Sequence, residues 1–332
     1  MNFSFIVPVY NRPDEIKELL ESLTKQNFAG NFDIIIIEDG STIPCEYIVD
    51  QYVNKLSITY YLKYNTGPGD SRNFGMKQSK GDYFIILDSD CILPENYLTA
   101  VDLSLKNKYV DCFGGPDAML PNFSALQKAI NFSMTSILTT GGIRGASEKM
   151  GKFQPRSFNM GLSKKAFEAS QGFSNIHPGE DPDLSIRLWK LGFETTLIKE
   201  AFVYHKRRID WESFYNQVTK FGKVRPILNA WYPEYSKFTY FLPSLFVIFF
   251  SVGVFALIFT FDWILKIYFA YTILIFVVSS IQNRNIYVGY LSIIAVWKQF
   301  FGYGIGFILS NFKLHILNKK PQEAFPELFF KI

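Results

Sequence analysis

Residues 82–90 have the sequence Asp82-Tyr-Phe-Ile-Ile-Leu-Asp88-Ser89-Asp90, an apolar run that ends in two acidic side chains. Such a run is typical of a strand that is buried on both faces of a parallel sheet. Residues two apart on a strand face the same side, so Asp88 and Asp90 are expected to project together. Open α/β sheets bind ligands beyond the carboxyl ends of their strands. The stretch therefore predicts a parallel sheet with a ligand site at its edge.

The segments on either side of this strand alternate between strand and helix patterns. Apolar runs of strand length and apolar residues at helical spacing follow one another at residues 3–9, 13–25, 33–37, 46–54, 57–62, 71–79, 82–87 and 95–105. This alternation is the pattern of β-α-β units. We therefore expect an α/β fold with a doubly wound, mostly parallel sheet. A less regular part follows, with a glycine-rich basic loop at residues 140–156.

The distribution of charge divides the chain into two parts. Residues 239–312 carry four charged side chains, whereas the rest of the chain has the charge content of an ordinary globular protein. Two uncharged stretches, at residues 238–261 and 267–283, are long enough to cross a bilayer. A third, at residues 285–312, is interrupted by Lys298. The sequence therefore predicts a soluble-type domain followed by a membrane part.

The composition excludes several classes of protein. A hydrophobic content of 48% excludes a disordered chain, and three cysteines do not make a disulfide scaffold. No Cys/His cluster has the spacing of a zinc site. The net charge of +4 is too small to indicate a nucleic-acid partner. The first apolar run lacks a basic flank before it, so no cleavable signal peptide is expected.

The acidic pair after the strand is a candidate metal site. Two adjacent carboxylates repel each other unless a cation lies between them, and oxygen ligands suit Mg²⁺ or Mn²⁺. Asp88 and Asp90 are therefore candidate ligands, with a plain polar turn as the alternative. His205, within a basic stretch, is a candidate third ligand, although a lone histidine is more often structural.

Three further polar motifs follow other strands or precede helices. They are Glu38-Asp39-Gly40-Ser41-Thr42, Gly67-Pro-Gly-Asp-Ser-Arg72-Asn73 and Gly179-Glu180-Asp181-Pro182-Asp183. Pro182 fits the first position of a helix, which makes Asp181 the expected N-cap. Asp181 thus has two candidate roles, a helix cap or an active-site base.

Taken in order along the chain, these motifs resemble those of the family-two glycosyltransferases, which have a GT-A fold. The resemblance covers about residues 1–225 and rests on Pro8-Val-Tyr10-Asn11, Glu38-Asp39-Gly40-Ser41, Ser71-Arg72-Asn73-Phe74-Gly75, Leu87-Asp88-Ser89-Asp90 and the motif at 179–183. Members of this family transfer a sugar from a nucleotide-sugar donor with inversion at the anomeric carbon. The C-terminal membrane helices make the layout similar to that of bacterial enzymes that extend lipid-linked exopolysaccharide or surface-glycan precursors.

The resemblance implies a donor site built from five residues. Pro8, Tyr10 and Asp39 would line the pocket of the nucleotide base. Arg72 would lie beside the nucleotide. Asp88 would be the first acid of the family's Asp-x-Asp motif and would contact the donor.

The resemblance also implies the metal site and the base. Asp90 would be the direct ligand of Mn²⁺ or Mg²⁺. His205 is added as a candidate further ligand on its residue type alone. Asp181 would be the catalytic base. We expect Glu180, the residue before it, to contact the acceptor. The chain departs from the family where many relatives have a third acid, since Cys91 follows the Asp-x-Asp here.

These expectations combine into one predicted function. The chain would be an inverting glycosyltransferase of the hexosyltransferase type that moves one sugar from a UDP-sugar to a hydroxyl of a membrane- or lipid-linked glycan, in polysaccharide biosynthesis. The Gln-x-x-Arg-Trp motif of processive synthases is not met by residues 217–221, which favours transfer of a single sugar. Two alternatives remain: a nucleotidyltransferase or sugar-phosphate transferase, and a membrane-anchored nucleotide-sugar-binding protein without turnover.

The sequence also predicts the organisation in the membrane. We expect a catalytic domain, an amphipathic connector, membrane segments and a basic tail at residues 1–225, 226–237, 238–312 and 313–332. Basic residues flank the membrane part on both sides, so the positive-inside rule places both ends in the cytoplasm. Residues 238–261 and 263–281 would be two full spans of the inner membrane, and residues 285–312 would be interfacial, re-entrant or a third span. The catalytic domain is expected on the cytoplasmic side.

Overall fold

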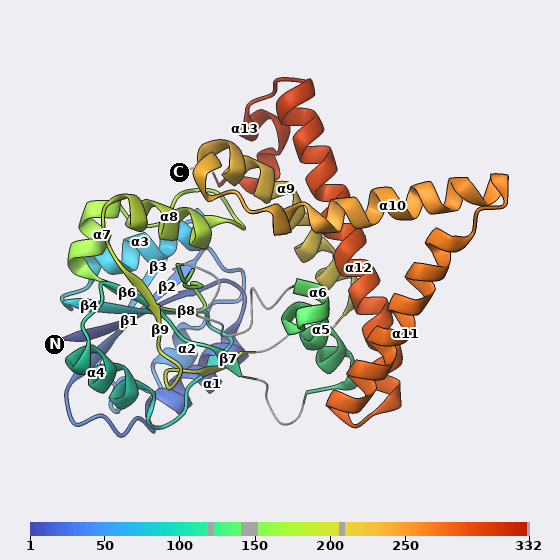
Figure 1. Cartoon of the computed structure of the whole chain (residues 1–332). Coiled ribbons are helices and arrows are strands. Elements are labelled where there is room, and N and C mark those ends of the chain that lie inside the picture. The colour runs from blue at the N-terminus through green and yellow to red at the C-terminus, as the bar shows by residue number, and fades with distance from the viewer. Residues whose placement is uncertain (119–122, 141–151, 206–209, 331–332) are drawn as a thin grey trace. The chain divides into compact units, whose positions relative to one another are not determined.

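The computed structural model describes residues 1–118, 123–140, 152–205 and 210–330, with the backbone alone at His205. The described residues form two compact units (Figure 1). The first takes its residues from 1–120, 148–206 and 329–332, and the second from 121–147 and 207–328. The units are thus not contiguous in sequence, and the linear boundary expected at residue 225 stays a prediction.

A mixed sheet forms the centre of the first unit. In the described part of the chain it has seven strands in the order β3 (Ile58–Lys63), β2 (Phe32–Asp39), β1 (Phe3–Val9), β4 (Tyr83–Leu87), β8 (Asn159–Ser163), β6 (Cys112–Gly114) and β9 (Thr195–Leu197). The first four strands are parallel, and β8 is antiparallel to both of its neighbours. The expectation of a mostly parallel sheet is therefore confirmed.

Helices cover both faces of this sheet, as Figure 1 shows. One hydrophobic cluster joins the sheet to α1 (Pro13–Leu23), α2 (Glu46–Val49) and α4 (Tyr97–Asn107). A second cluster on the other face joins it to α3 (Pro68–Gln78), α7 (Lys164–Ser170) and α8 (Glu180–Lys190). Alternate side chains of each central strand enter alternate clusters, because successive residues of a strand point to opposite faces. The layers are those of a doubly wound fold.

A small second sheet lies beside the acidic pair. Its strands are β5 (Cys91–Ile92), β10 (Val203–His205) and β7 (Asp117–Ala118). The register of β10 against β5 places His205 opposite Cys91, the residue after Asp90.

Asn159, at the start of β8, fills a polar position inside the first unit. Its side chain accepts a hydrogen bond of 2.6 Å from the Tyr97 hydroxyl and donates one of 2.8 Å to the Ala201 carbonyl. Replacing Asn159 with leucine should destabilise the fold, because each orphaned buried group costs about 1–3 kcal/mol. The apparent melting temperature should fall, whereas Asn107→Leu, at an exposed position, should leave it nearly unchanged. Equal melting temperatures for the two variants would contradict this account of the core.

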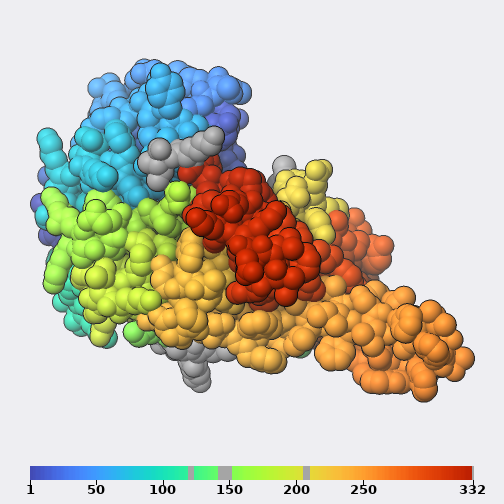
Figure 2. Space-filling model, turned by 90° about the horizontal axis from the view of Figure 1, so that it is seen from above, coloured from blue at the N-terminus to red at the C-terminus, as the bar shows by residue number. Residues whose placement is uncertain are grey.

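The second unit is helical. Its helices are α5 (Ala125–Thr135), α6 (Ile137–Thr140), α9 (Trp211–Trp231), α10 (Leu242–Ala256), α11 (Trp263–Asn283), α12 (Ile286–Asn311) and α13 (Pro321–Ala324). Among the described residues, three helices are long and apolar enough to cross a membrane, at Leu242–Phe259, Trp263–Asn283 and Ile286–Ile316. The helix α12 runs unbroken past Lys298, where the charge had divided the predicted segment in two. Figure 2 shows the side chains of α10 and α11, in orange, at the surface of this unit.

Candidate active site

The polar motifs meet at one edge of the main sheet. The parallel register pairs Val9 with Glu38 and Ile6 with Ile86, so β1, β2 and β4 end close together. Tyr10 follows β1, Asp39 ends β2, and the acidic pair follows β4. The carboxyl edge is where an open α/β sheet binds its ligand.

Asp39 anchors the loop that leads into α3. Its Oδ1 accepts hydrogen bonds from Lys63 Nζ at 2.8 Å and from the Thr66 amide at 3.0 Å, and its Oδ2 accepts one from the Gly67 amide at 3.0 Å. The Asp39 side chain is buried, whereas Tyr10 is 51% exposed. At this end of the site, Asp39 therefore holds the loop in place, and the exposed Tyr10 side chain is accessible to a ligand. Pro8 lies in β1, half-buried beside them.

Arg72 connects the acidic pair to the start of α8. Its Nη2 donates to Asp88 Oδ1 at 2.7 Å, and its Nη1 donates to Glu180 Oε1 at 3.3 Å. The guanidinium lies 5.3 Å from the centre of the Phe173 ring and is 3% exposed. Its Nε is buried and has no hydrogen-bond partner in the described structure. An unmatched buried donor is costly, so this atom is a natural contact for a bound ligand.

The acidic pair is neutralised by two arginines. Asp88 bonds to Arg72, and Asp90 Oδ2 accepts a bond of 2.8 Å from Arg12 Nη1. The described residues contain no group of three His, Cys, Asp or Glu side chains that would hold a metal by themselves. Mg²⁺ is usually held by one or two carboxylates together with substrate phosphates, so the two acids fit a cation that arrives with a nucleotide. The backbone of His205 lies nearby through its pairing with Cys91, and its side chain lies outside the described residues.

Asp181 is not the N-cap of α8, so that part of the sequence analysis is wrong. The helix begins at Glu180, and the cap is Gly179, whose φ of 122° favours glycine. Asp181 is the second residue of the helix, and its Oδ1 is buried without a hydrogen-bond partner in the described structure. Burial, reinforced by the negative charge of Glu180, raises the pKa of Asp181 to about 6.

Glu180 has the opposite electrostatic environment. Burial acts to raise its pKa, but His177 and Arg72 outweigh burial and lower the pKa of Glu180 to about 2. Its Oε1 lies 2.8 Å from His177 Nδ1. The neighbouring carboxyls therefore divide into one that stays ionised inside an ion-pair network and one that exchanges a proton near neutral pH. The contact of Glu180 with an acceptor stays a prediction.

Comparison with known proteins identifies the domain that carries this site. Residues 4–167 match the family model described as Glycosyl transferase family 2. This region is a family 2 glycosyltransferase domain. The name applies to the stretch that contains Tyr10, Asp39, Arg72 and the acidic pair, whereas Glu180 and Asp181 follow it.

Two curated relatives of the family 2 domain are similar to this chain over different lengths. The poly(ribitol-phosphate) beta-N-acetylglucosaminyltransferase TarS of Staphylococcus aureus is 43% identical over 93 residues, which are 27% of this chain and 16% of TarS. The glycosyltransferase GlyG of Streptococcus pneumoniae is 26% identical over 215 residues, 62% of this chain and 70% of GlyG. The match to TarS is thus confined to a small part of a longer protein.

Two solved structures share the fold. The crystal structure of S. aureus TarS 1–349 has a TM-score of 0.50 at 22% identity, covering 69% of this chain and 65% of that one. The mannosyltransferase PcManGT from Pyrobaculum calidifontis, in complex with GDP-Man and Mn²⁺, has a TM-score of 0.54 at 14% identity, covering 68% and 63%. These similarities confirm the GT-A fold expected from the sequence.

Sequence reasoning missed two residues of the site. Arg12 directly follows the Pro8-Val-Tyr10-Asn11 motif, and His177 lies three residues before Glu180. Arg12 carried no signal, since a basic residue before a helix is usually solvated. His177 lies beside the start of an acidic helix, where a histidine at this spacing could have suggested a partner for Glu180.

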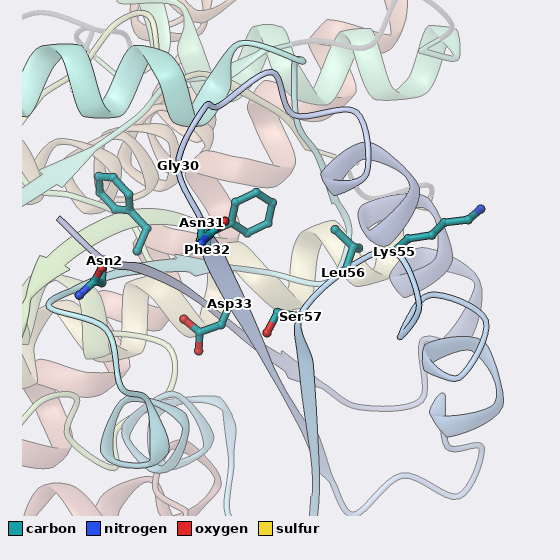
Figure 3. Close-up of a pocket in the computed structure, with 9 residues that line it drawn as sticks. Asn2, Gly30, Asn31, Phe32, Asp33, Lys55, Leu56 and Ser57 are labelled. Carbon is teal, nitrogen blue, oxygen red and sulfur yellow. The ribbon is translucent and has the colours of Figure 1, made fainter.

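Two other features lie outside this constellation. Asp183 is paired with Arg187, whose Nε and Nη2 donate to Asp183 Oδ2 at 3.0 and 2.7 Å, so it has a structural partner. The hollow of about 520 Å³ in Figure 3 lies at the opposite edge of the sheet, where β1, β2 and β3 begin. Most of the basic loop at 140–156 and the basic residues after His205 lie outside the described residues.

Proposed function

We propose that this chain is an inverting glycosyltransferase that moves one sugar from a nucleotide-sugar donor to a hydroxyl of a membrane- or lipid-linked glycan. The observation that carries the proposal is that one buried arginine, Arg72, bonds to two carboxylates from different parts of the chain, Asp88 and Glu180. Arg72 contacts Asp88 on the donor side and Glu180 next to the proposed base. The family 2 domain and the names of its relatives support the same reaction class.

The donor is proposed to bind along the carboxyl edge of the sheet. Tyr10, Pro8 and Asp39 would receive the nucleotide base, and the diphosphate would reach Asp88 and Asp90. A GDP-sugar and Mn²⁺ accompany PcManGT in its structure, which supports a nucleotide sugar and a divalent cation here. When bound, Mn²⁺ or Mg²⁺ would neutralise the negative charge that develops on the departing diphosphate.

The proposed chemistry is a single displacement. The acceptor hydroxyl oxygen forms a bond to the anomeric carbon while the bond from that carbon to the diphosphate oxygen breaks. The diphosphate leaves with the bonding electron pair, and the hydroxyl proton passes to Asp181. A base with a pKa near the working pH is favoured for such a transfer. Glu180 keeps Asp181 weakly acidic by its charge, and Arg72 and His177 hold Glu180 in place.

Enzyme activity should depend on pH through Asp181. A base accepts a proton only when it is ionised. The value of kcat/KM should therefore decrease as the pH drops below about 6, the pKa of Asp181, and should be constant at higher pH. Glu180→Gln removes one of the two causes that raise this pKa and should move the acid limb to lower pH. The measurement is kcat/KM against pH for both proteins. A wild-type limb near the ordinary aspartate pKa of 3.8 would contradict the assignment.

We also propose that the catalytic unit lies on the cytoplasmic side of the inner membrane. Nucleotide sugars are made in the cytoplasm, and three helices of the second unit have the length and composition of membrane spans.

A donor screen tests the proposed function. The purified full chain would be mixed with Mn²⁺ and UDP-, GDP- or dTDP-sugars, and the melting temperature and calorimetric affinity would be measured. One class of nucleotide sugar should bind, and Asp90→Asn should weaken its binding, whereas the exposed control Asp50→Asn should not. Absence of binding by every nucleotide sugar to a folded protein would refute the proposal.

A further inference from the structure

The last described residues, Phe329 and Phe330, belong to the first unit, although they follow the helices of the second in sequence. The Phe330 amide donates to the Asn175 carbonyl at 3.1 Å, and the Asn175 side chain donates to the Phe330 carbonyl at 3.4 Å. Phe329 forms an antiparallel β-bridge with Ile176. The backbone of this returning segment is therefore fixed on the loop that contains Asn175 and Ile176.

That loop, residues 173–179, leads into α8 and has two anchors. At its start, the Asn73 side chain, on α3, donates to the Phe173 carbonyl at 2.7 Å and accepts from the Phe173 amide at 2.8 Å. Farther along, residues 175–176 are held by the returning segment. The part of the loop closest to α8 thus depends on the end of the chain for its support.

The Phe330 ring contacts residues from two loops. It lies against Gly67, where a Cβ would collide with the ring, so the absence of a side chain at Gly67 leaves room for it. Its centre lies 6.1 Å from that of the His177 ring, with the two planes inclined at 52°. Aromatic rings pack favourably at about 4.5–7 Å between centres. Because its backbone bonds and Gly67 fix the Phe330 ring, it offers His177 a fixed surface.

His177 is the member of the site that most needs such a support. Its side chain is 41% exposed, whereas that of Glu180 is 5% exposed. Its Nδ1 lies 2.8 Å from Glu180 Oε1, the same oxygen that accepts from Arg72. A half-exposed side chain keeps rotamer freedom that the pairing with Glu180 must restrict, and packing against a fixed ring reduces that cost.

We propose that Phe330 is a positioning residue of the active site: its ring holds His177 against Glu180 and thereby orients the start of α8, where Asp181 lies. The inference rests on the proposed function, because it takes Glu180 and Asp181 as the acceptor side of the site. It gives the returning segment a role in sugar transfer, on the side of the site away from the acidic pair.

Hydrogen exchange on the purified full chain tests the support of the loop without an assay of sugar transfer. Phe330→Ala removes the ring and keeps the backbone bonds, so the amides of residues 173–179 should exchange faster than in the wild type. Phe330→Tyr, which keeps a ring, should exchange at the wild-type rate. Tyr47→Ala removes an exposed ring from α2 and is the control, with no change expected. Unchanged exchange of the loop in Phe330→Ala would overturn the proposal.

Turnover and donor affinity separate positioning from a merely structural role. A misplacement of about 1 Å can cost about 10²-fold in rate, so Phe330→Ala should lower kcat by about 10–10²-fold. Donor affinity should be retained, because Asp88 and Asp90 are unchanged, and Phe330→Tyr should restore kcat. Phe330→Leu, which keeps apolar bulk without a ring, replaces Phe330→Ala if that variant does not fold. An unchanged kcat per folded molecule would make Phe330 a structural residue and overturn the proposal.

A double-mutant cycle shows whether Phe330 acts through His177. His177→Ala should lower kcat, and adding Phe330→Ala should lower it little further, because the side chain that the ring positions is already gone. Losses that multiply in the double variant would mean independent action and would overturn the proposal.

The same measurements distinguish failure of this inference from failure of the proposed function. Wild-type protein that transfers no sugar would refute the proposed function, and the hydrogen exchange of Phe330→Ala would still decide whether the ring supports the loop. An active wild type with an equally active Phe330→Ala would overturn this inference and leave the proposed function intact.

Discussion

Replacing Asp181 with asparagine should lower turnover by about 10²–10⁴-fold, the usual effect of losing a general base. Asparagine keeps the size of the side chain but does not accept the acceptor's proton at neutral pH. Since Gly179, and not Asp181, caps α8, the substitution should not disturb the helix start. Donor affinity should be retained, because Asp88 and Asp90 are unchanged. Turnover, donor affinity and melting temperature would be measured on the same preparation.

Asp183→Asn is the matched control for Asp181→Asn. It makes the same chemical change two residues away, where the carboxylate is paired with Arg187. That variant should lose thermal stability while its turnover per folded molecule changes little. If Asp181→Asn is well folded and turns over at nearly the wild-type rate, Asp181 is not the base.

Removal of divalent cations should abolish sugar transfer, and Mn²⁺ or Mg²⁺ should restore it. The expectation follows from Asp88 and Asp90, a carboxylate pair at the ligand-binding edge of the sheet. Asp90→Asn should lose turnover and also bind the donor more weakly. The assay is transfer in EDTA, followed by titration of each cation, with Asp50→Asn as the exposed control.

The alternative to a divalent cation is charge neutralisation by two arginines, Arg12 and Arg72. Each is bonded to one carboxylate of the pair, at 2.8 and 2.7 Å. Full activity in EDTA would mean that these guanidinium groups neutralise the diphosphate without a metal. In that case Arg12→Met should reduce transfer strongly. If a metal is needed, Arg12→Met should instead lower the cation concentration required, because Arg12 no longer competes for Asp90.

The sheet and the position of the acidic residues at its carboxyl edge were predictable because their signals are local. Buried parallel strands such as β1 and β4 are continuous apolar runs, and the acids that follow them are adjacent in sequence. The antiparallel strand β8 was missed because Asn-Met-Gly-Leu-Ser is short and mixed in polarity. Gly161 of β8 lies against the ring of Phe113. These two residues are far apart in the sequence, so a local sequence pattern does not predict their contact.

The electrostatics of the site could not be predicted for a similar reason. Arg12 and Asp90 are 78 residues apart, and Arg72 and Glu180 are 108 apart. Their pairing depends on how the strands are ordered in space. The raised pKa of Asp181 likewise needs both its burial and the fixed charge of Glu180. The sequence identifies Glu180 and Asp181 as candidate site residues, but it does not show that Glu180 stays ionised while the pKa of Asp181 is raised.

The membrane part shows the same limit. Apolar length predicted three candidate segments correctly, but length alone does not distinguish a span from a helix that packs along a charged neighbour. The contacts of Gly302 and Gly306 with α9 and the return of Phe330 to Asn175 join residues far apart in the chain, and apolar length alone does not predict them.

The most direct test of the central claim is to identify what leaves the donor. The purified full chain, Mn²⁺ and the nucleotide sugar that binds best would be incubated with a lipid extract of the cells that make the protein. The account predicts that labelled sugar enters the lipid fraction with release of one nucleoside diphosphate per sugar, and that Asp181→Asn does neither. Release of a nucleoside monophosphate or of inorganic diphosphate would identify a sugar-phosphate or nucleotidyl transferase instead, and donor binding without any release would identify a binding protein.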